Sequence, residues 1–367
     1  MNISLFNTYI NSSAFHKVKT VLSSTFLSEG QLVKEFEHAL ATNLNLVSPT
    51  LVNSGTSALH LALILSGLGS DDEVICPAQT FIASATAILQ ANAVPVFADI
   101  QYETGNLCPR SVEEKISHRT RAIMPVHWGG YPCDLEEIHA IARKYNLIVI
   151  EDAAHALGAT YKGKPIGSLS DFTCFSFQAI KHLTTGDGGA VCCLDPQMSQ
   201  KAITQRWFGI DRKNSSLSPL GERQYNITEL GFKYHLNDYA AALGLANLEG
   251  FKDRLEQRRR YAQLYDSKLG KISGITPFQY KKDRESAYWL YGFHVERRDD
   301  FIAALKSRGI AASVVHQRID RNSIFGGIKS DLVNQAKFDN SQIHIPMHDA
   351  LTEETVNYII ESIQLGW

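Results

Sequence analysis

Short apolar runs alternate with stretches of helical periodicity over the first two thirds of the chain. Apolar residues dominate positions 73–76, 94–97, 122–126, 147–150, 172–177 and 190–194. Helical spacing covers residues 15–27, 31–44, 57–68, 81–92, 111–116 and 134–145. Strands that are apolar on nearly every residue, separated by helices, are typical of a parallel sheet covered on both faces. The pattern predicts a large α/β domain over residues 1–245.

The pattern changes after Asn237. Residues 238–269 form one predicted long helix, which we expect to bridge two domains. Residues 298–308 and 352–363 are predicted helices, and residues 291–295, 311–315 and 343–346 are predicted strands. These shorter elements predict a smaller α+β domain over residues 246–367.

Charge and cysteine content narrow the class of protein. The 367 residues hold 36 Lys and Arg against 38 Asp and Glu, a net charge of −2, which gives no footprint for nucleic acid or an anionic membrane. The six cysteines include no Cys-x-x-Cys pair, so we expect buried thiols and no metal site. No signal peptide or membrane span is evident, so we expect a cytoplasmic protein.

The first chemical motif lies between a strand and the predicted helix 57–68. Gly55, Thr56 and Ser57 are small residues at a helix N-terminus, where free N–H groups and the helix dipole favour an anion. The hydroxyls of Thr56 and Ser57 add hydrogen-bond donors for such an anion. An ordinary helix cap explains the same residues.

The second motif is the acidic pair that follows the predicted strand 147–150. Ligands of open α/β sheets bind at the carboxyl ends of the strands, and a buried acid there needs a partner. Asp152 is therefore expected to face a cation or a protonated ring nitrogen. The alternative is an acid that caps the next segment.

The third motif is a polar, Gly-rich turn after the apolar run 172–177, with Lys181 at its centre. An amine beside an apolar run is desolvated, which lowers its pKa and favours the neutral form that makes a Schiff base. Ser176 can donate to a phosphate. A surface lysine is the alternative, but the glycines indicate close approach to a ligand.

Together the three motifs supply what a pyridoxal 5′-phosphate (PLP) enzyme needs: an anion cradle, an acid at a strand end and a Schiff-base lysine. The chain resembles the sugar aminotransferases of the DegT/DnrJ/EryC1/StrS family over nearly its whole length. The resemblance rests on residues 53–60, 77–81, 151–155, 175–189 and 231–238. It implies the fold type I architecture, with a mostly parallel seven-stranded sheet between helices in the large domain.

The resemblance also implies roles for individual residues. Lys181 would form the imine with PLP and Asp152 would pair with its pyridine nitrogen; pyridoxamine 5′-phosphate (PMP) would be the intermediate form of the cofactor. The other cofactor contacts would be phosphate donors Gly55, Thr56, Ser57 and Ser176, ring contacts Phe81 and His155, and Asn237, which would reach the cofactor of a neighbouring subunit. The resemblance thus implies a homodimer with shared active sites.

Two departures from the family pattern affect the predicted turn. Many relatives have His where this chain has Gln178 and Asn where it has His182, which puts details of substrate contact in doubt. Relatives that act as dehydratases replace the lysine by His. Because Lys181 is present, transamination is favoured.

The resemblance implies transfer of an amino group from L-glutamate to a nucleotide-linked keto-deoxysugar, for lipopolysaccharide, O-antigen or related amino-sugar biosynthesis. His316, Arg318 and Arg212 are candidate donors to the diphosphate or the donor carboxylate. Three alternatives remain: a PMP-dependent sugar dehydratase, an aminocyclitol aminotransferase and a non-catalytic regulator with the same fold.

Overall fold

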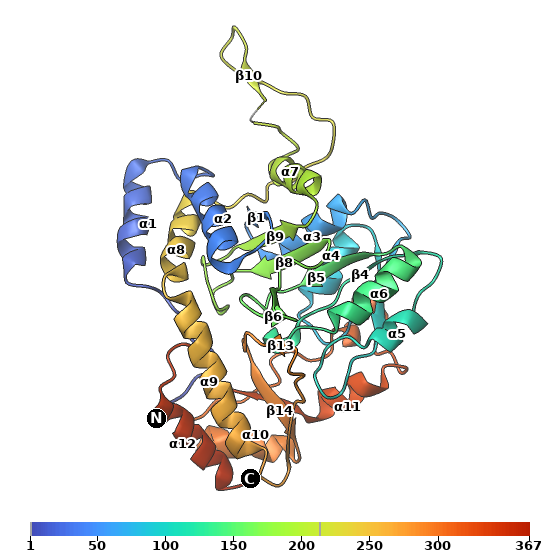
Figure 1. Ribbon diagram of the computed structural model, residues 1–367, viewed down its shortest axis with the longest axis vertical. Helices are drawn as coiled ribbons and strands as arrows, with labels where there is room; N and C mark the ends of the chain where they lie inside the picture. The colour runs from blue at the N-terminus through green and yellow to red at the C-terminus, as the bar shows by residue number, and fades with distance from the viewer. Residues whose placement is uncertain (1, 213) are drawn as a thin grey trace.

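The computed structural model describes residues 2–212 and 214–367. Its main sheet has seven strands in the order β1-β9-β8-β5-β4-β2-β3 (Figure 1). All neighbouring strands are parallel except β9, which runs antiparallel to β1 and to β8. The strands are β1 (Pro49–Val52), β2 (Glu73–Pro77), β3 (Val94–Ala98), β4 (Thr120–Ile123), β5 (Ile148–Asp152), β8 (Phe172–Ser176) and β9 (Gly189–Cys193).

Helices cover both faces of this sheet, as the apolar strands predicted. Successive strand residues alternate between two buried clusters: Val149 belongs to one and Ile150 to the other. Helix α3 is buried on nearly every residue and packs on β8 and β9. The helices are α1 (Ser13–Ser24), α2 (Gln31–Leu44), α3 (Gly55–Leu65), α4 (Ala83–Gln90), α5 (Pro109–Glu114), α6 (Leu135–Tyr145), α7 (Pro196–Gln205) and α8 (Asp238–Leu248).

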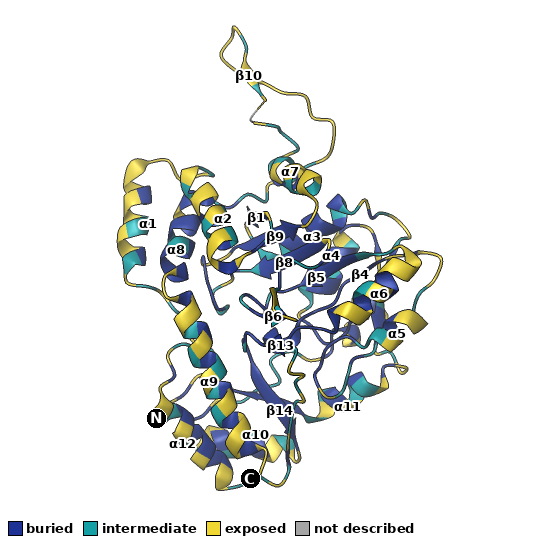
Figure 2. Ribbon diagram, viewed as in Figure 1, coloured by how far each residue is buried: buried dark blue, intermediate teal, exposed yellow. Residues whose placement is uncertain are grey.

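The chain that follows the long helix α9 (Phe251–Leu269) forms a second, smaller group of strands and helices (Figure 1). A three-stranded antiparallel sheet, β12 (Ile275–Pro277), β14 (Tyr291–Val295) and β15 (Gln342–Ile345), encloses its own apolar cluster with the helices around it. Figure 2 shows buried residues in both parts of the molecule. The remaining helices are α10 (Arg298–Ser307), α11 (Val333–Ser341) and α12 (Glu353–Gln364).

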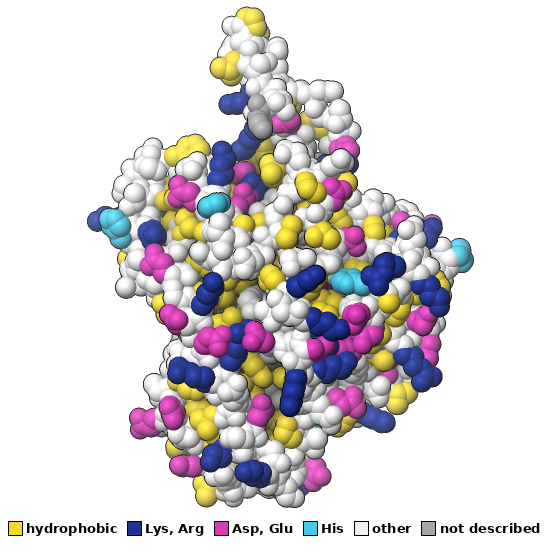
Figure 3. All heavy atoms as spheres, viewed as in Figure 1, with side chains coloured by type: hydrophobic (Ala, Val, Ile, Leu, Met, Phe, Trp, Pro, Cys, Tyr) yellow, Lys and Arg dark blue, Asp and Glu magenta, His cyan; other side chains and the backbone are white. Residues whose placement is uncertain are grey.

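Two small antiparallel sheets complete the structure. Strands β6 (Thr160–Tyr161), β7 (Lys164–Pro165) and β13 (Arg284–Glu285) form one. Strands β10 (Ser216–Leu217) and β11 (Arg223–Gln224) form a hairpin that projects from the rest of the chain (Figure 1). On the face drawn in Figure 3, basic and acidic side chains are interspersed. Within the described residues, no helix has the length and apolarity that a membrane crossing requires.

The structure corrects three element predictions. The expected helix 238–269 is two helices, because Gly250 has φ +66°, a left-handed conformation that glycine tolerates and that interrupts the helix. The expected strand 311–315 is reduced to a single bridge between Ser313 and His344. Strand β5 extends through Asp152 rather than ending at residue 150. The predicted domain boundary at residues 245/246 falls inside α8, just before the break, and stays a prediction.

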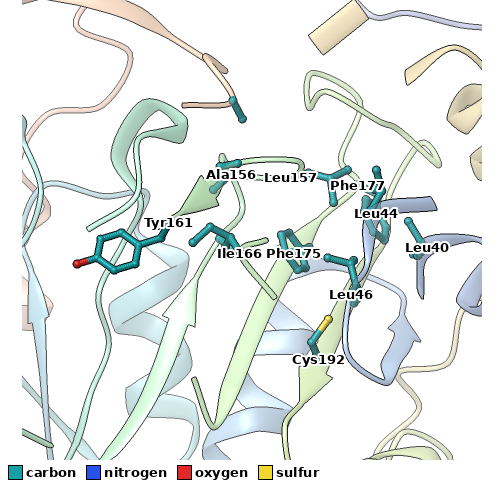
Figure 4. Packing of buried hydrophobic residues seen from close by; sticks show 14 of the residues in the cluster. Leu40, Leu44, Leu46, Ala156, Leu157, Tyr161, Ile166, Phe175, Phe177 and Cys192 are labelled. Atoms are coloured by element: carbon teal, nitrogen blue, oxygen red, sulfur yellow. The ribbon is translucent and has the colours of Figure 1, made fainter. Parts of the chain in front are cut away.

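Aromatic and aliphatic side chains fill the space between α2 and the end of β8. Leu40, Leu44 and Leu46 lie near Phe175 and Phe177 (Figure 4). Phe36, also from α2, has its ring centroid 5.7 Å from that of Phe177. The segment that leads from β8 into the predicted cofactor turn is therefore fixed by core packing.

Replacing Phe36 by Ala tests this packing. Phe36 is fully buried, so the variant should lose about 3–5 kcal/mol in free energy of unfolding. Chemical denaturation followed by fluorescence measures the loss. Leu365→Ala is the control, because Leu365 is 77% exposed and should change stability by less than about 0.5 kcal/mol. Equal losses in the two variants would contradict the packing account.

Candidate active site

A cavity of about 280 Å³ opens where the carboxyl ends of β2, β5 and β8 meet the start of α3. This is the edge of the sheet at which ligands of open α/β folds bind. Eight of the predicted site residues line it: Gly55, Thr56, Phe81, Asp152, His155, Ser176, Lys181 and His316. The cavity therefore brings together segments that lie far apart in the sequence.

Lys181 lies in the loop after β8, and its Nζ is 3.7 Å from the centre of the Trp289 ring. Part of the residue is exposed, but the amine lies deep, and burial lowers the pKa of Lys181 to about 7 while the nearby Asp152 charge opposes that shift. A large fraction of the amine is therefore neutral near neutral pH, and the neutral form is the nucleophile.

Asp152 is the last residue of β5 and is 5% exposed. Its Oδ2 accepts a hydrogen bond from Ser84 Oγ at 2.6 Å, and its Oδ1 accepts one from the Ala154 N–H at 3.1 Å. These donors fix the carboxylate on the cavity wall. A buried carboxylate in this position suits a protonated ring nitrogen.

The start of α3 offers N–H groups and hydroxyls that can bind a phosphate. Ser54 caps the helix by accepting from the Ser57 N–H at 3.0 Å, and Gly55 and Thr56 follow in the first turn, whose N–H groups have no partner within the helix. A Cβ on Gly55 would lie 2.8 Å from the Ser176 Cβ. Only glycine allows the helix start to approach β8 so closely, and the residues present thus fit PLP.

Aromatic rings enclose the rest of the cavity. The Phe81 side chain is 53% exposed, and its ring centroid lies 5.2 Å from that of His316. His155 stacks on Trp289 at 3.8 Å, and its Nδ1 is buried without a partner in the part of the chain that the structure describes. Burial also lowers the pKa of His316 to about 4, so this ring is neutral at neutral pH.

Two predicted cofactor residues lie outside the cavity lining. The Ser57 hydroxyl donates to Asn53 Oδ1 at 2.6 Å. Asn237 caps α8, because its Oδ1 accepts from the Ala240 N–H at 2.9 Å. Within one chain, both side chains therefore make hydrogen bonds at the N-terminus of a helix, Ser57 at α3 and Asn237 at α8.

The two predicted substrate arginines also lie elsewhere. The Arg318 guanidinium makes a bidentate pair with Asp320, at 2.7 and 2.6 Å, and both residues are buried. This geometry gives Arg318 no access to a ligand in the cavity. The Arg212 guanidinium stacks on Trp207 at 3.9 Å, at the base of the projecting hairpin.

Sequence reasoning missed Trp289, which lines the cavity, and Ser84, which donates to the Asp152 carboxylate. Trp289 comes from a segment more than 100 residues after Lys181, and no local pattern announces it. Ser84 was hidden inside an apolar helix pattern, and no local pattern shows that its hydroxyl reaches Asp152.

The fold and the cavity together define the class of protein, a fold type I transferase that depends on PLP. The model of the DegT/DnrJ/EryC1/StrS aminotransferase family matches residues 8–364. The chain belongs to this family, and the predicted fold class, cofactor and enzyme class are confirmed. It is a sugar aminotransferase in the broad sense of that family.

Named relatives agree with this assignment. GDP-perosamine synthase of Caulobacter vibrioides is 35% identical over 93% of this chain and 92% of its own length. CalS13, a sugar aminotransferase of Micromonospora echinospora, is 35% identical, with a TM-score of 0.94 and full coverage of both chains. Spr1654 of Streptococcus pneumoniae, solved in PLP and PMP forms, is 30% identical with a TM-score of 0.91; its PLP form covers 100% of this chain and 98% of its own.

The pKa of Lys181 gives a pH prediction for the apoprotein. Below pH 7 the amine is protonated and cannot attack an aldehyde, so the rate of PLP uptake should fall by about tenfold per pH unit there and level off above pH 7. Stopped-flow absorbance after mixing PLP with apoprotein measures this rate. A rate that still climbs tenfold per unit at pH 9 would show an unperturbed lysine, and Lys181→Met should show no such phase.

Proposed function

We propose that the protein transfers an amino group from L-glutamate to a nucleotide-linked keto-deoxysugar, in the biosynthesis of a cell-surface polysaccharide such as lipopolysaccharide O-antigen. The observation that carries the proposal is Lys181, an amine with a pKa of about 7, in one cavity with Asp152. The name of the Caulobacter relative supports a nucleotide-linked amino sugar as product. A cytoplasmic location is part of the proposal.

We assign the roles of the cavity residues as follows. When bound, PLP draws electrons from the carbon that carries the amino group. Asp152 would hold a proton on the pyridine nitrogen, and Gly55, Thr56 and Ser176 would bind the phosphate. Phe81 would stack on the ring of the cofactor, and His155 would lie near the ring and its phenolic oxygen, because both residues line the cavity.

Lys181 would move the proton in this proposal. As a neutral amine, its Nζ would take the proton from Cα of the amino donor and pass it to C4′ of the cofactor, and it would move a proton from C4′ to the acceptor carbon in the reverse direction. Such positioned acid–base catalysis contributes about 10²- to 10⁴-fold in rate. His316, beside Phe81 in the cavity, would contact the substrate as a neutral hydrogen-bonding group.

We further propose a homodimer with shared active sites. Asn237 caps α8 within its own chain through its side-chain oxygen. Its side-chain NH₂ group would reach the cofactor phosphate of the neighbouring subunit. Helix α8 packs against α1 and α2, and α1 exposes Phe15 and Leu22. An exposed apolar strip of this kind marks an interaction surface.

Spectra of the purified holoenzyme test the proposed reaction. L-glutamate should shift the visible band of bound PLP to that of PMP, and nucleotide keto-sugars should restore the band. Mass spectrometry should find an aminated sugar, and Lys181→Ala should lower turnover by at least about 10². A deoxygenated product would favour the dehydratase, and an aminated cyclitol would favour the aminocyclitol aminotransferase. A spectrum that stays unchanged with every amino donor would favour the non-catalytic regulator.

Gly55→Ala tests the phosphate cradle. The added Cβ would lie 2.8 Å from the Ser176 Cβ and push the start of α3 away, so affinity for PLP should fall by about tenfold. Affinity for pyridoxal, which lacks the phosphate, should change by less than about twofold, because the lost interaction is with the anion. Gly69→Ala is the control, since its Cβ meets nothing within 4 Å. Equal losses for PLP and pyridoxal would contradict the cradle.

A further inference from the structure

A line of three side chains connects the start of α4 to Asp152. Ser84 Oγ donates to Asp152 Oδ2 at 2.6 Å, and Thr80 Oγ1 lies 2.6 Å from Ser84 Oγ. A hydroxyl has one proton to donate, and that of Ser84 goes to the carboxylate. Thr80 is therefore the donor in the second bond. The order of donation runs from Thr80 through Ser84 to the carboxylate, and we call these two side chains the hydroxyl relay.

The hydroxyl relay is sealed from solvent. Thr80 is 1% exposed and Ser84 0% exposed, whereas Phe81, between them in the sequence, is 53% exposed. The segment at the start of α4 thus exposes an aromatic ring and buries two hydroxyls, one of which reaches the Asp152 carboxylate. In such a dry environment a hydrogen bond to a charged group is stronger than in water, and its loss is costly.

The relay acts on one oxygen of the carboxylate and the backbone on the other. Asp152 Oδ1 accepts from the Ala154 N–H at 3.1 Å. Rotation of the carboxylate about its bond to Cβ would break both hydrogen bonds. The orientation of the acid toward the cavity is therefore set by Ser84 as much as by β5.

We propose that Ser84, supported by Thr80, is a positioning residue for the cofactor: it fixes the Asp152 carboxylate in the orientation that pairs with the pyridine nitrogen of PLP. This inference rests on the proposed role of Asp152. Ser84 Oγ also lies 3.4 Å from the Phe81 carbonyl, and a purely local role in the start of α4 is the competing account.

Four variants of the full-length protein and one control separate the two accounts. Ser84→Ala removes the donor to Asp152, Thr80→Val removes the first hydroxyl, and Thr80→Ser retains it. Asp152→Asn removes the charge itself. Thr86→Val is the matched control, because Thr86 lies on α4 and its hydroxyl donates to the Ile82 carbonyl at 3.0 Å.

The readouts are the PLP dissociation constant of the apoprotein, from absorbance titration, and the pH dependence of the bound cofactor's spectrum. Ser84→Ala should weaken PLP binding by about tenfold, as expected for one hydrogen bond to a charged group. Thr80→Val should weaken it by about threefold, the effect of a neutral hydrogen bond. Thr80→Ser and Thr86→Val should match the wild type, and the spectral transition should shift only in Ser84→Ala, Thr80→Val and Asp152→Asn.

Each contrary result has a distinct meaning. If Asp152→Asn weakens PLP binding and Ser84→Ala does not, the relay is overturned and the role of Asp152 stands. If Asp152→Asn changes neither readout, the proposed role of Asp152 fails and the relay falls with it. If Ser84→Ala and Thr86→Val lower the melting temperature equally with unchanged PLP binding, the local role in α4 replaces the proposal.

Discussion

The approach of the start of α3 to the end of β8 and the start of β9 is the constraint on which the cavity depends. A Cβ on Gly55 would lie 2.8 Å from the Ser176 Cβ, and a Cβ on Gly189 would lie 2.6 Å from the Ser54 backbone. Two glycines therefore let a helix N-terminus contact two strands without a side chain between them. This contact places the N–H groups of α3 opposite the loop that carries Lys181. The core residues of β8, held by α2, keep the contact in place.

Strand alternation assigns two adjacent acids to different tasks. Asp152 faces the cavity, while Glu151 points to the other side of β5 and is fully buried. Burial alone would raise the pKa of Glu151, but hydrogen bonds from His127, at 2.6 Å, and Thr173 outweigh it and hold the pKa below its usual value. The His127 Nδ1 accepts from the Cys133 N–H, so Nε2 carries the proton toward Glu151. One acid is thus satisfied inside the core and the other is left available to a ligand.

The chemistry of the cavity was accessible from the sequence because it lies in local motifs at strand ends. Gly55, Asp152 and Lys181 each follow an apolar run and Ser176 lies at the end of one, and parallel strands bring their carboxyl ends to one edge. The placement of the arginines was not accessible in this way. The charge pattern does not reveal that Arg318 folds onto Asp320 two residues later, nor that Trp289 lies under Lys181. The break at Gly250 was not predicted, although a glycine there allows the left-handed φ that separates α8 from α9.

These placements sharpen the question of how a diphosphate would be bound. Among the described residues no arginine lines the cavity, and burial leaves its histidines neutral rather than cationic, as the lowered pKa values of His155 and His316 show. A net charge of −2 gives no general attraction for such an anion. The cationic donors that a nucleotide sugar needs would then have to come from outside the cavity of one chain. Of the two predicted arginines, Arg212 is partly exposed outside the cavity, stacked on Trp207 at the base of the projecting hairpin, whereas Arg318 is held by Asp320.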